Sequence, residues 1–218
     1  MVHRVVVALG GDFFITCAEA CSGACRFTQR SAPTLNGWVK SSAREMQDMF
    51  GLNTSFNQDI SLWDVSNVVT MEGMFENAIS FNQNIDSWDV SSTINMYNMF
   101  NSCQEGNGSF NQDLSSWNFN SSVFLGGIFN CSSVDVDNYD VLLQSMYNQP
   151  LVNKEFGDFS LVYCNQQDHD ALISEKGWTF DGGQLSITGI SAPESIISEP
   201  DPGACIATNG ELGTPDVF

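Results

Sequence analysis

The chain has 218 residues, of which 42% are hydrophobic, so it is long enough for one domain with a modest core. Seven Lys and Arg residues stand against 26 Asp and Glu residues, which gives a formal net charge of −19 at pH 7. A surface this acidic repels phosphate backbones and anionic lipids. The composition therefore argues against nucleic acids and acidic membranes as partners, while basic proteins, neutral glycans and divalent cations remain compatible with it.

The first thirty residues carry weak signals for export. Arg4 is followed by an apolar run and by an Ala-Glu-Ala segment that ends at Ala20 and resembles a cleavage site, although Asp12 interrupts the apolar stretch. We therefore treat residues 1–30 as an uncertain N-terminal segment, either a degenerate signal peptide or a start placed upstream of the domain. No later stretch has the length and hydrophobicity to span a bilayer, so we predict no transmembrane segment.

A repeat of 25 residues dominates the middle of the chain. Its copies read FNQDISLWDVSNVVTMEGMF from Phe56, FNQNIDSWDVSSTINMYNMF from Phe81 and FNQDLSSWNFNSSVFLGGIF from Phe110, and the first two are identical at eleven of twenty positions. A polar insert over residues 104–109 lengthens one loop, and a half-eroded copy over residues 31–50 brings the total to about four. Such a fixed period indicates a repeat fold.

Each copy predicts the same local structure. Apolar and β-branched residues between Ile60 and Val68 suit a short strand, whereas apolar residues spaced by three and four between Met71 and Ala78 suit one face of a helical turn. One copy cannot bury its own apolar face, but stacked copies place equivalent residues about 4.8 Å apart in continuous columns of Trp, Ile, Met and Phe. We therefore predict an α/β repeat fold, a short solenoid of about four coils over residues 31–135.

Two different segments follow the repeats. Residues 136–183 mix apolar and polar positions, and we predict a C-terminal cap there because the open end of a stack leaves its apolar columns uncovered. Residues 184–218 hold four of the six prolines together with many Ser, Gly and acidic residues. This composition is typical of an acidic linker or tail.

Polar residues also recur in columns. Asn57, Asn82 and Asn111, each followed by Gln, stand where the chain turns, and we expect them to bond backbone groups there. Asp64 and Asp89 form a second column, which either accepts amide hydrogens two residues on or holds Ca²⁺ between stacked carboxylates. We favour the first role, because no dense acidic loop accompanies the pair, and predict no metal site and no cofactor.

Seven cysteines leave at least one without a partner in the same chain. Cys103 and Cys131 follow equivalent phenylalanines in neighbouring copies, so stacking brings their backbones into disulfide range, with two buried thiols as the alternative. Cys17, Cys21 and Cys25 are spaced by four and lack both the paired spacing and the fourth ligand of a zinc site. Disulfides, or removal with a signal peptide, explain these three better.

The sequence offers almost no catalytic residues. His3 and His169 are the only histidines, and no nucleophile elbow, phosphate-binding glycine loop or zinc-protease motif is present. Cys164 and His169 are the single nucleophile and base pair in the sequence, and an ordinary surface loop accounts for them better. We therefore predict a non-catalytic protein without catalytic, cofactor-binding or metal-binding residues.

The pattern FNQDIS-x-WDVSNV-x-x-M-x-x-MF resembles the repeat of the BspA-like leucine-rich repeat surface proteins. The resemblance covers residues 35–131 directly and extends to about residue 183, because segments such as Asn138–Leu143 and Gly177–Gly183 look like the family's C-terminal cap. It implies a leucine-rich-repeat-like solenoid in a secreted or cell-surface protein that takes part in adhesion and whose repeats have no catalytic activity.

Together, these features predict an extracellular or cell-surface module that binds a protein or glycan partner through one face of the coils. The alternatives are a structural wall or matrix spacer without a specific ligand, and a Ca²⁺-dependent adhesin. Nothing in the sequence indicates an oligomeric state. Exposed positions that vary between coils would select the partner: Leu62, Ser87 and Ser116 beside the tryptophans, and Glu72, Tyr97 and Gly126 after the methionine position.

Overall fold

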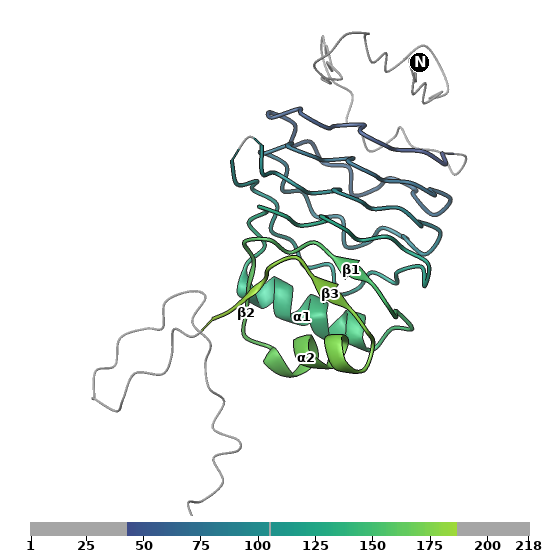
Figure 1. Ribbon diagram of the computed structural model, residues 1–218. Coiled ribbons are helices and arrows are strands. Elements are labelled where there is room, and N and C mark those ends of the chain that lie inside the picture. The colour runs from purple at the N-terminus through teal and green to yellow at the C-terminus, as the bar shows by residue number, and fades with distance from the viewer. Residues whose placement is uncertain (1–42, 105, 187–218) are drawn as a thin grey trace, which may run out of the picture.

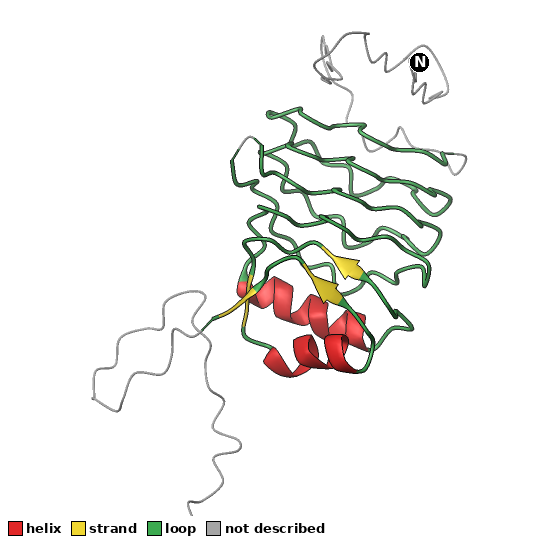
Figure 2. Cartoon of the chain, in the orientation of Figure 1, coloured by secondary structure: helices red, strands yellow, loops and turns green. Residues whose placement is uncertain are grey.

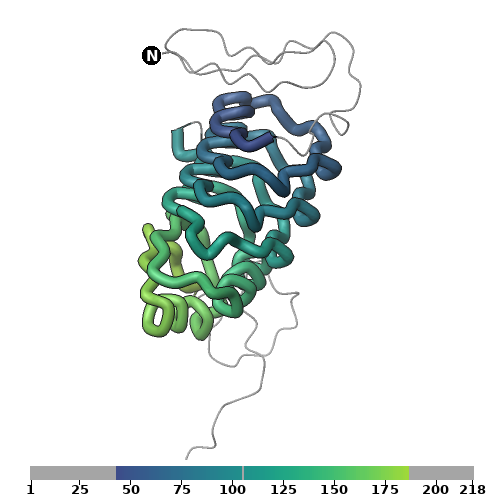
Figure 3. Tube along the Cα trace, turned by 90° about the vertical axis from the view of Figure 1, so that its right-hand side faces the viewer, coloured from purple at the N-terminus to yellow at the C-terminus, as the bar shows by residue number. Residues whose placement is uncertain are grey.

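The computed structural model describes residues 43–104 and 106–186. The predictions for residues 1–30, for Cys17, Cys21 and Cys25, for the first part of the 31–50 copy and for the tail beyond residue 186 lie outside these ranges. In the described part, the repeats follow one another as stacked turns of the chain (Figure 1 and, from the side, Figure 3). The helices of this part come only after the last repeat (Figure 2).

Neighbouring repeats are joined by isolated parallel bridges. The bridges link Glu45 to Thr70, Thr70 to Asn95, and Asn95 to Phe124, so the same position of each repeat pairs with the next. They lie just before the buried methionine position, not between residues 60 and 68, where the sequence predicts a strand. Single bridges suffice there because each extended stretch lasts only a few residues before the chain turns.

The segment 71–78 is not the helical turn that its spacing predicts. The amides of Met71 and Gly73 donate to the next repeat at N···O distances of 2.8 and 2.9 Å, while those of Met74 and Glu76 bond three residues back in their own repeat. Gly73 and Asn77 have φ angles of 58° and 55°, a left-handed conformation that a right-handed helix does not contain. Successive tight turns send side chains inward at intervals of three and four, as a helix does, so the spacing alone could not separate the two.

The core consists of the predicted columns of equivalent side chains. The ring of Phe75 lies 3.9 Å from that of Phe81, at the start of the next repeat, and 5.6 Å from that of Phe100, at the end of that repeat. In the tryptophan column, the indole Nε1 of Trp88 donates to the carbonyl oxygen of Ile60 at 3.2 Å, so a bulky ring is buried with its polar atom satisfied. The buried columns are Met46, Met71, Met96 and Leu125; Phe50, Phe75, Phe100 and Phe129; Phe56, Phe81 and Phe110; and Trp63, Trp88 and Trp117.

The asparagine column bonds the turns as the sequence predicts. The side-chain oxygen of Asn57 accepts from the backbone amide of Asn82 and from Nε2 of Gln83, both at 2.9 Å. Asn82 repeats the arrangement one repeat on, accepting from the backbone amide of Asn111 at 2.9 Å. Each asparagine therefore ties its own repeat to the following one.

Asp64 and Asp89 cap turns, as expected. Oδ1 of Asp64 accepts from the amide of Ser66 at 3.2 Å and from its hydroxyl at 2.6 Å. Oδ1 of Asp89 accepts from Ser91 in the same way, at 3.1 and 2.6 Å, and these bonds lower the pKa of Asp89 below its usual value. Both carboxylates are thus engaged locally.

Two helices cover the end of the stack. Helix α1 (Val136–Tyr147) begins at Asp135, whose side chain accepts from the amide of Asn138 at 2.9 Å, and helix α2 (Gln166–Ser174) begins at Asn165 in the same manner. Helix α1 turns one apolar side inward, consisting of Tyr139, Leu142, Leu143 and Met146. Figure 1 shows both helices beside the last repeat.

Four short strands complete the C-terminal region. The parallel pairs are β1 (Glu155–Phe156) with β3 (Thr179–Phe180), and β2 (Val162–Tyr163) with β4 (Gln184–Leu185). A bridge from Leu125 to Phe156 joins the region to the last repeat. Strand β4 lies beyond residue 183, so this region extends slightly past the boundary suggested by composition. The division of the chain into domains stays a prediction.

Candidate binding face

One side of the stack carries side chains that change from repeat to repeat. It is formed by the bridge residues and by the residues two positions after them, and we call it the bridge face. The backbone is extended around the bridges, so the residue between these two positions points inward and is always Met or Leu. The bridge face comprises Glu45, Thr70, Asn95 and Phe124 together with Gln47, Glu72, Tyr97 and Gly126.

Aromatic side chains gather on the bridge face at the third and fourth repeats. The rings of Tyr97 and Phe124 stack with their centroids 5.6 Å apart and their planes 23° apart, yet Tyr97 stays 40% exposed and Phe124 45%. Ile94, which is 45% exposed, adjoins them through its backbone, since its carbonyl oxygen accepts from the amide of Phe124 at 3.0 Å. We call the two stacked rings of Tyr97 and Phe124 the aromatic platform.

Gly126 makes room for the aromatic platform. A Cβ atom at this position would lie 3.2 Å from Cδ2 of Tyr97 and 3.4 Å from Cζ of Phe124. Both rings therefore lie over the backbone of the fourth repeat, where any larger residue would push them away. The repeats before it carry Gln47, Glu72 and Tyr97 at the same position, so the space opens only here.

A polar rim borders the aromatic platform on the side of the second repeat. Nδ2 of Asn95 donates to Oε2 of Glu72 at 2.8 Å, and Oδ1 of Asn95 accepts from the backbone amide of Tyr97 at 3.0 Å. Further along, Nδ2 of Asn98 donates to Oε1 of Glu76 at 3.3 Å. These bonds fix the amide and carboxylate groups beside the rings.

The N-terminal end of the bridge face is acidic. Burial raises the pKa of Asp48 above its usual value, and the negative charge of Glu72 adds to the effect. The pKa of Glu76 is also raised, first by burial and then by the charges of Asp48 and Glu72. This end of the face therefore repels anions. No cluster of three or more His, Cys, Asp or Glu suited to a metal ion is found in residues 43–104 and 106–186.

The structure separates the positions that the sequence singled out. Glu72, Tyr97 and Gly126 lie together on the bridge face. The hydroxyl groups of Ser87 and Ser116, by contrast, donate to carbonyl oxygens of the preceding repeat at 3.1 and 2.8 Å, so they serve to join repeats. Leu62, in the same column as these serines, is 73% exposed and is not part of the bridge face.

Sequence reasoning missed Phe124 and Ile94. Phe124 stands where the other repeats have Glu45, Thr70 and Asn95, directly before the inward methionine position. In an extended stretch, neighbouring side chains point to opposite sides, so a residue directly before the inward methionine position points outward. A phenylalanine at such an outward position was the available signal. It was not recognised because the sequence predicts a helical turn, not an extended stretch, around the methionines.

The cysteines of the described part are bonded. Cys103 and Cys131 form a disulfide with a Cα–Cα distance of 5.0 Å, which joins the third and fourth repeats beside the polar insert. Of the two alternatives left open by the sequence, the bond is the one present. Cys164 is also disulfide-bonded, so its sulfur is not a free nucleophile for His169 to activate.

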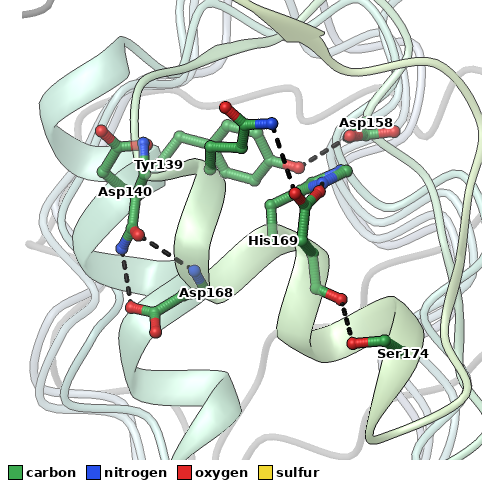
Figure 4. Close-up of polar contacts among 9 residues, drawn as sticks. Tyr139, Asp140, Asp158, Asp168, His169 and Ser174 are labelled. Carbon is green, nitrogen blue, oxygen red and sulfur yellow. Dashed lines mark hydrogen bonds and ion pairs between the residues drawn. The ribbon is translucent and has the colours of Figure 1, made fainter. Parts of the chain in front are cut away.

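His169 lies inside the C-terminal region and not at an open site. Its ring stacks between Tyr163 and Phe180, with centroids 4.1 and 4.4 Å away, and the residue is 7% exposed. Close by, the hydroxyl of Tyr139 donates to Oδ2 of the fully buried Asp158 at 2.7 Å (Figure 4). Burial, followed by the charge of Asp158, raises the pKa of Tyr139 well above its usual value. These contacts tie α2 to β2 and β3, and α1 to the loop between β1 and β2.

The described residues thus define a repeat protein with a variable, partly aromatic face. Residues 19–148 match the family described as "Mycoplasma protein of unknown function, DUF285". Because this match covers more than half of the 218 residues, the chain belongs to the DUF285 family. No curated protein and no solved structure matches the chain.

In the part of the chain that the structure describes, no helix combines the length and the hydrophobicity needed to span a bilayer.

Proposed function

We propose that this protein is a non-catalytic interaction module, secreted or displayed at a cell surface, that binds a protein or glycan partner through the bridge face. The observation that carries the proposal is the contrast between neighbouring columns. The inward column is Met, Met, Met and Leu, whereas the outward position after it holds Gln47, Glu72, Tyr97 and Gly126. Packing explains the first column, and a partner explains why the second differs in every repeat.

The exposed aromatic rings favour a binding module over a wall or matrix spacer. A spacer gains nothing from Tyr97 and Phe124 in contact with water, because polar residues at these positions would support the same backbone ladder. Stacked apolar side chains on the surface of a soluble protein are typical of interaction sites. The variable face and the platform together therefore support recognition of a partner.

We also infer that the chain is a BspA-like leucine-rich repeat protein with a short solenoid and a C-terminal cap. The inference is supported by the repeat pattern, by the parallel bridges between equivalent positions and by helices α1 and α2 beside the last repeat. Membership of DUF285 adds to it, because that family is associated with BspA-like surface repeat proteins. The disulfide between Cys103 and Cys131 supports an extracellular location, since such bonds persist in oxidising compartments.

Localisation tests the first half of the proposal. The full chain with a C-terminal tag is expressed in its host, and intact cells are treated with a protease that does not enter them. We expect the tag in the medium or removed from the cell surface. A tag that stays protected inside intact cells, with reduced cysteines, contradicts the proposed function.

Binding tests the second half. Purified protein is applied to surfaces coated with extracellular matrix proteins or with polysaccharides, and retention is compared with and without Ca²⁺. We expect retention that does not depend on Ca²⁺, because the side chains of Asp64 and Asp89 already cap turns. Retention lost on removal of Ca²⁺ would favour the adhesin that uses this cation, and no retention at all would favour the spacer.

A further inference from the structure

We propose that the aromatic platform is a subsite for a pyranose ring of a neutral glycan. The proposal rests on the proposed function and specifies its partner. The site consists of Tyr97 and Phe124 as the apolar floor and of Glu72 and Asn95 as the polar rim. Nothing in the repeat pattern requires these residues, since the other repeats carry different side chains at the same positions.

The chemistry of the platform matches an amphipathic ligand. A pyranose has an apolar patch of C–H groups on one side of its ring and hydroxyl groups around its edge. Tyr97 and Phe124 offer aromatic carbon to the C–H groups, while the rim offers an amide and a carboxylate to the hydroxyls. Both kinds of group are needed at once, and on the described bridge face only the third and fourth repeats provide the rings.

Hydrogen-bonding capacity remains on the rim. A carboxylate has about four acceptor positions, and one side-chain donor from the described residues, Nδ2 of Asn95, is directed at Glu72. The hydroxyl of Tyr97 has no hydrogen-bond partner among residues 43–104 and 106–186, so it is available as both donor and acceptor. Sugar hydroxyls can therefore bond here without displacing a bond that holds the repeats together.

The size of the platform argues against a protein partner that binds through it alone. A stable protein interface buries about 1,200 Å² or more in total, which two side chains of this exposure do not supply. One sugar ring needs only such a small contact. The backbone ladder holds the platform in place before the ligand arrives, which limits the entropy lost on binding.

Charge restricts the class of glycan. Asp48, Glu72 and Glu76 lie on the same face as the platform, and the chain has a formal net charge of −19. Uronic acids and sulfated sugars would be repelled. A neutral hexose polymer meets no such barrier, so the site is assigned to uncharged sugars.

The experiment is affinity electrophoresis, which measures the mobility of the full chain in gels that contain a neutral glucan, mannan or galactan. Gels that contain polygalacturonate provide the anionic comparison. We expect at least one neutral polysaccharide to retard the protein and polygalacturonate not to. Tyr97→Ala and Phe124→Ala should each weaken the affinity by about tenfold, the size of one aromatic stacking contact. Tyr97→Phe, which keeps the ring, should retain most of the affinity.

Phe159→Ala is the matched control. Phe159 is an aromatic residue that is even more exposed, at 55%, but it lies beside Cys131 and outside the bridge face, so its loss should leave the affinity unchanged. Saturation-transfer NMR of the unmodified protein gives a second readout that does not depend on how a variant folds. Irradiation of the aromatic protons should transfer magnetisation to the C–H protons of the retarding sugar.

Three outcomes would overturn the proposal. In the first, no neutral polysaccharide retards the protein. In the second, the retardation is unchanged in Tyr97→Ala and Phe124→Ala. In the third, irradiation of the aromatic protons transfers no magnetisation to the retarding sugar. A second binding test, on a surface coated with deglycosylated matrix protein, distinguishes failure of the glycan subsite from failure of the proposed function. Retention there that depends on Tyr97 would leave the interaction module standing with a protein partner, whereas a chain that binds neither surface would refute both.

Discussion

The repeats and the C-terminal region are stabilised in different ways. Between repeats, the same contacts recur: phenylalanines stack at 5.5 to 5.9 Å along a column, and Asn57 and Asn82 each accept from the next repeat. In the C-terminal region, single contacts such as that between Tyr139 and Asp158 occur once. The repeats therefore share their stability among equivalent contacts, whereas the C-terminal region depends on particular ones.

The largest expected effect comes from the phenylalanine columns. Phe100 is 2% exposed and stacks on rings of both neighbouring repeats, so Phe100→Ala opens a cavity in the middle of the stack. We expect the free energy of unfolding to fall by about 3–5 kcal/mol, measured by chemical denaturation. Hydrogen exchange should show the loss of protection in the neighbouring repeats first, because each repeat contacts chiefly its neighbours.

Phe124→Ala is the matched control for this prediction. It removes the same side chain from the same stack at a position that is 45% exposed, so it should change the stability little. Equal losses for the two variants would show that the columns do not carry the stability of the repeats.

Removal of the disulfide between the third and fourth repeats has the next largest expected effect. The bond closes a loop with a sequence separation of 28 residues, and its loss frees the unfolded chain. The double variant Cys103→Ser and Cys131→Ser should lower the free energy of unfolding by about 2–4 kcal/mol. The measurement is thermal unfolding of the variant beside the oxidised and the reduced parent chain. A variant as stable as the oxidised parent would contradict the prediction.

Tyr139→Phe tests the C-terminal region. The change leaves the buried Asp158 with the amide of Gly182 as its remaining described donor, so we expect a loss of about 1–3 kcal/mol. Hydrogen exchange should increase in residues 136–186 while the first three repeats keep their protection. Tyr147→Phe is the control, since its hydroxyl bonds Glu175 in solvent and its loss should matter little. Increased exchange spread evenly over the whole chain would remove the distinction between the two regions.

The periodicity of the sequence predicted the stacking, the columns and the polar turns, because identical residues 25 positions apart have one simple way to be buried together. It did not predict the path of the chain between Met71 and Ala78, because a run of turns and a helix place side chains inward at the same intervals. Of the residues at the platform, the sequence singled out Tyr97 and Gly126. It did not single out Phe124, because the outward direction of this side chain follows from the local backbone and not from the 25-residue period.

The smallest expected effect is a gain in stability at the acidic end of the bridge face. Burial and the charges of Asp48 and Glu72 raise the pKa of Glu76 in the folded protein above its ordinary value of 4.5, so its ionised form is less favourable in the folded state than in the unfolded state. The resulting penalty is present at pH 7, decreases as the pH falls through the raised pKa and is absent below 4.5. Glu76→Gln removes the charge but keeps an oxygen that can accept from Asn98.

The variant Glu76→Gln should therefore be more stable than the parent at pH 7, by about 0.5 kcal/mol or less, because solvent screens a half-exposed group. The advantage should shrink as the pH is lowered toward 4.5. Thermal unfolding at a series of pH values measures both. Asp113→Asn is the control, since Asp113 is exposed and an Asn there can still accept from the amide of Ser115, as Asn84 accepts from Asp86 one repeat earlier. A stability advantage of Glu76→Gln that persists at pH 4 would mean that Glu76 acts through packing and not through its charge. The clustering of negative charge at the acidic end of the bridge face would then not lower the stability of the fold.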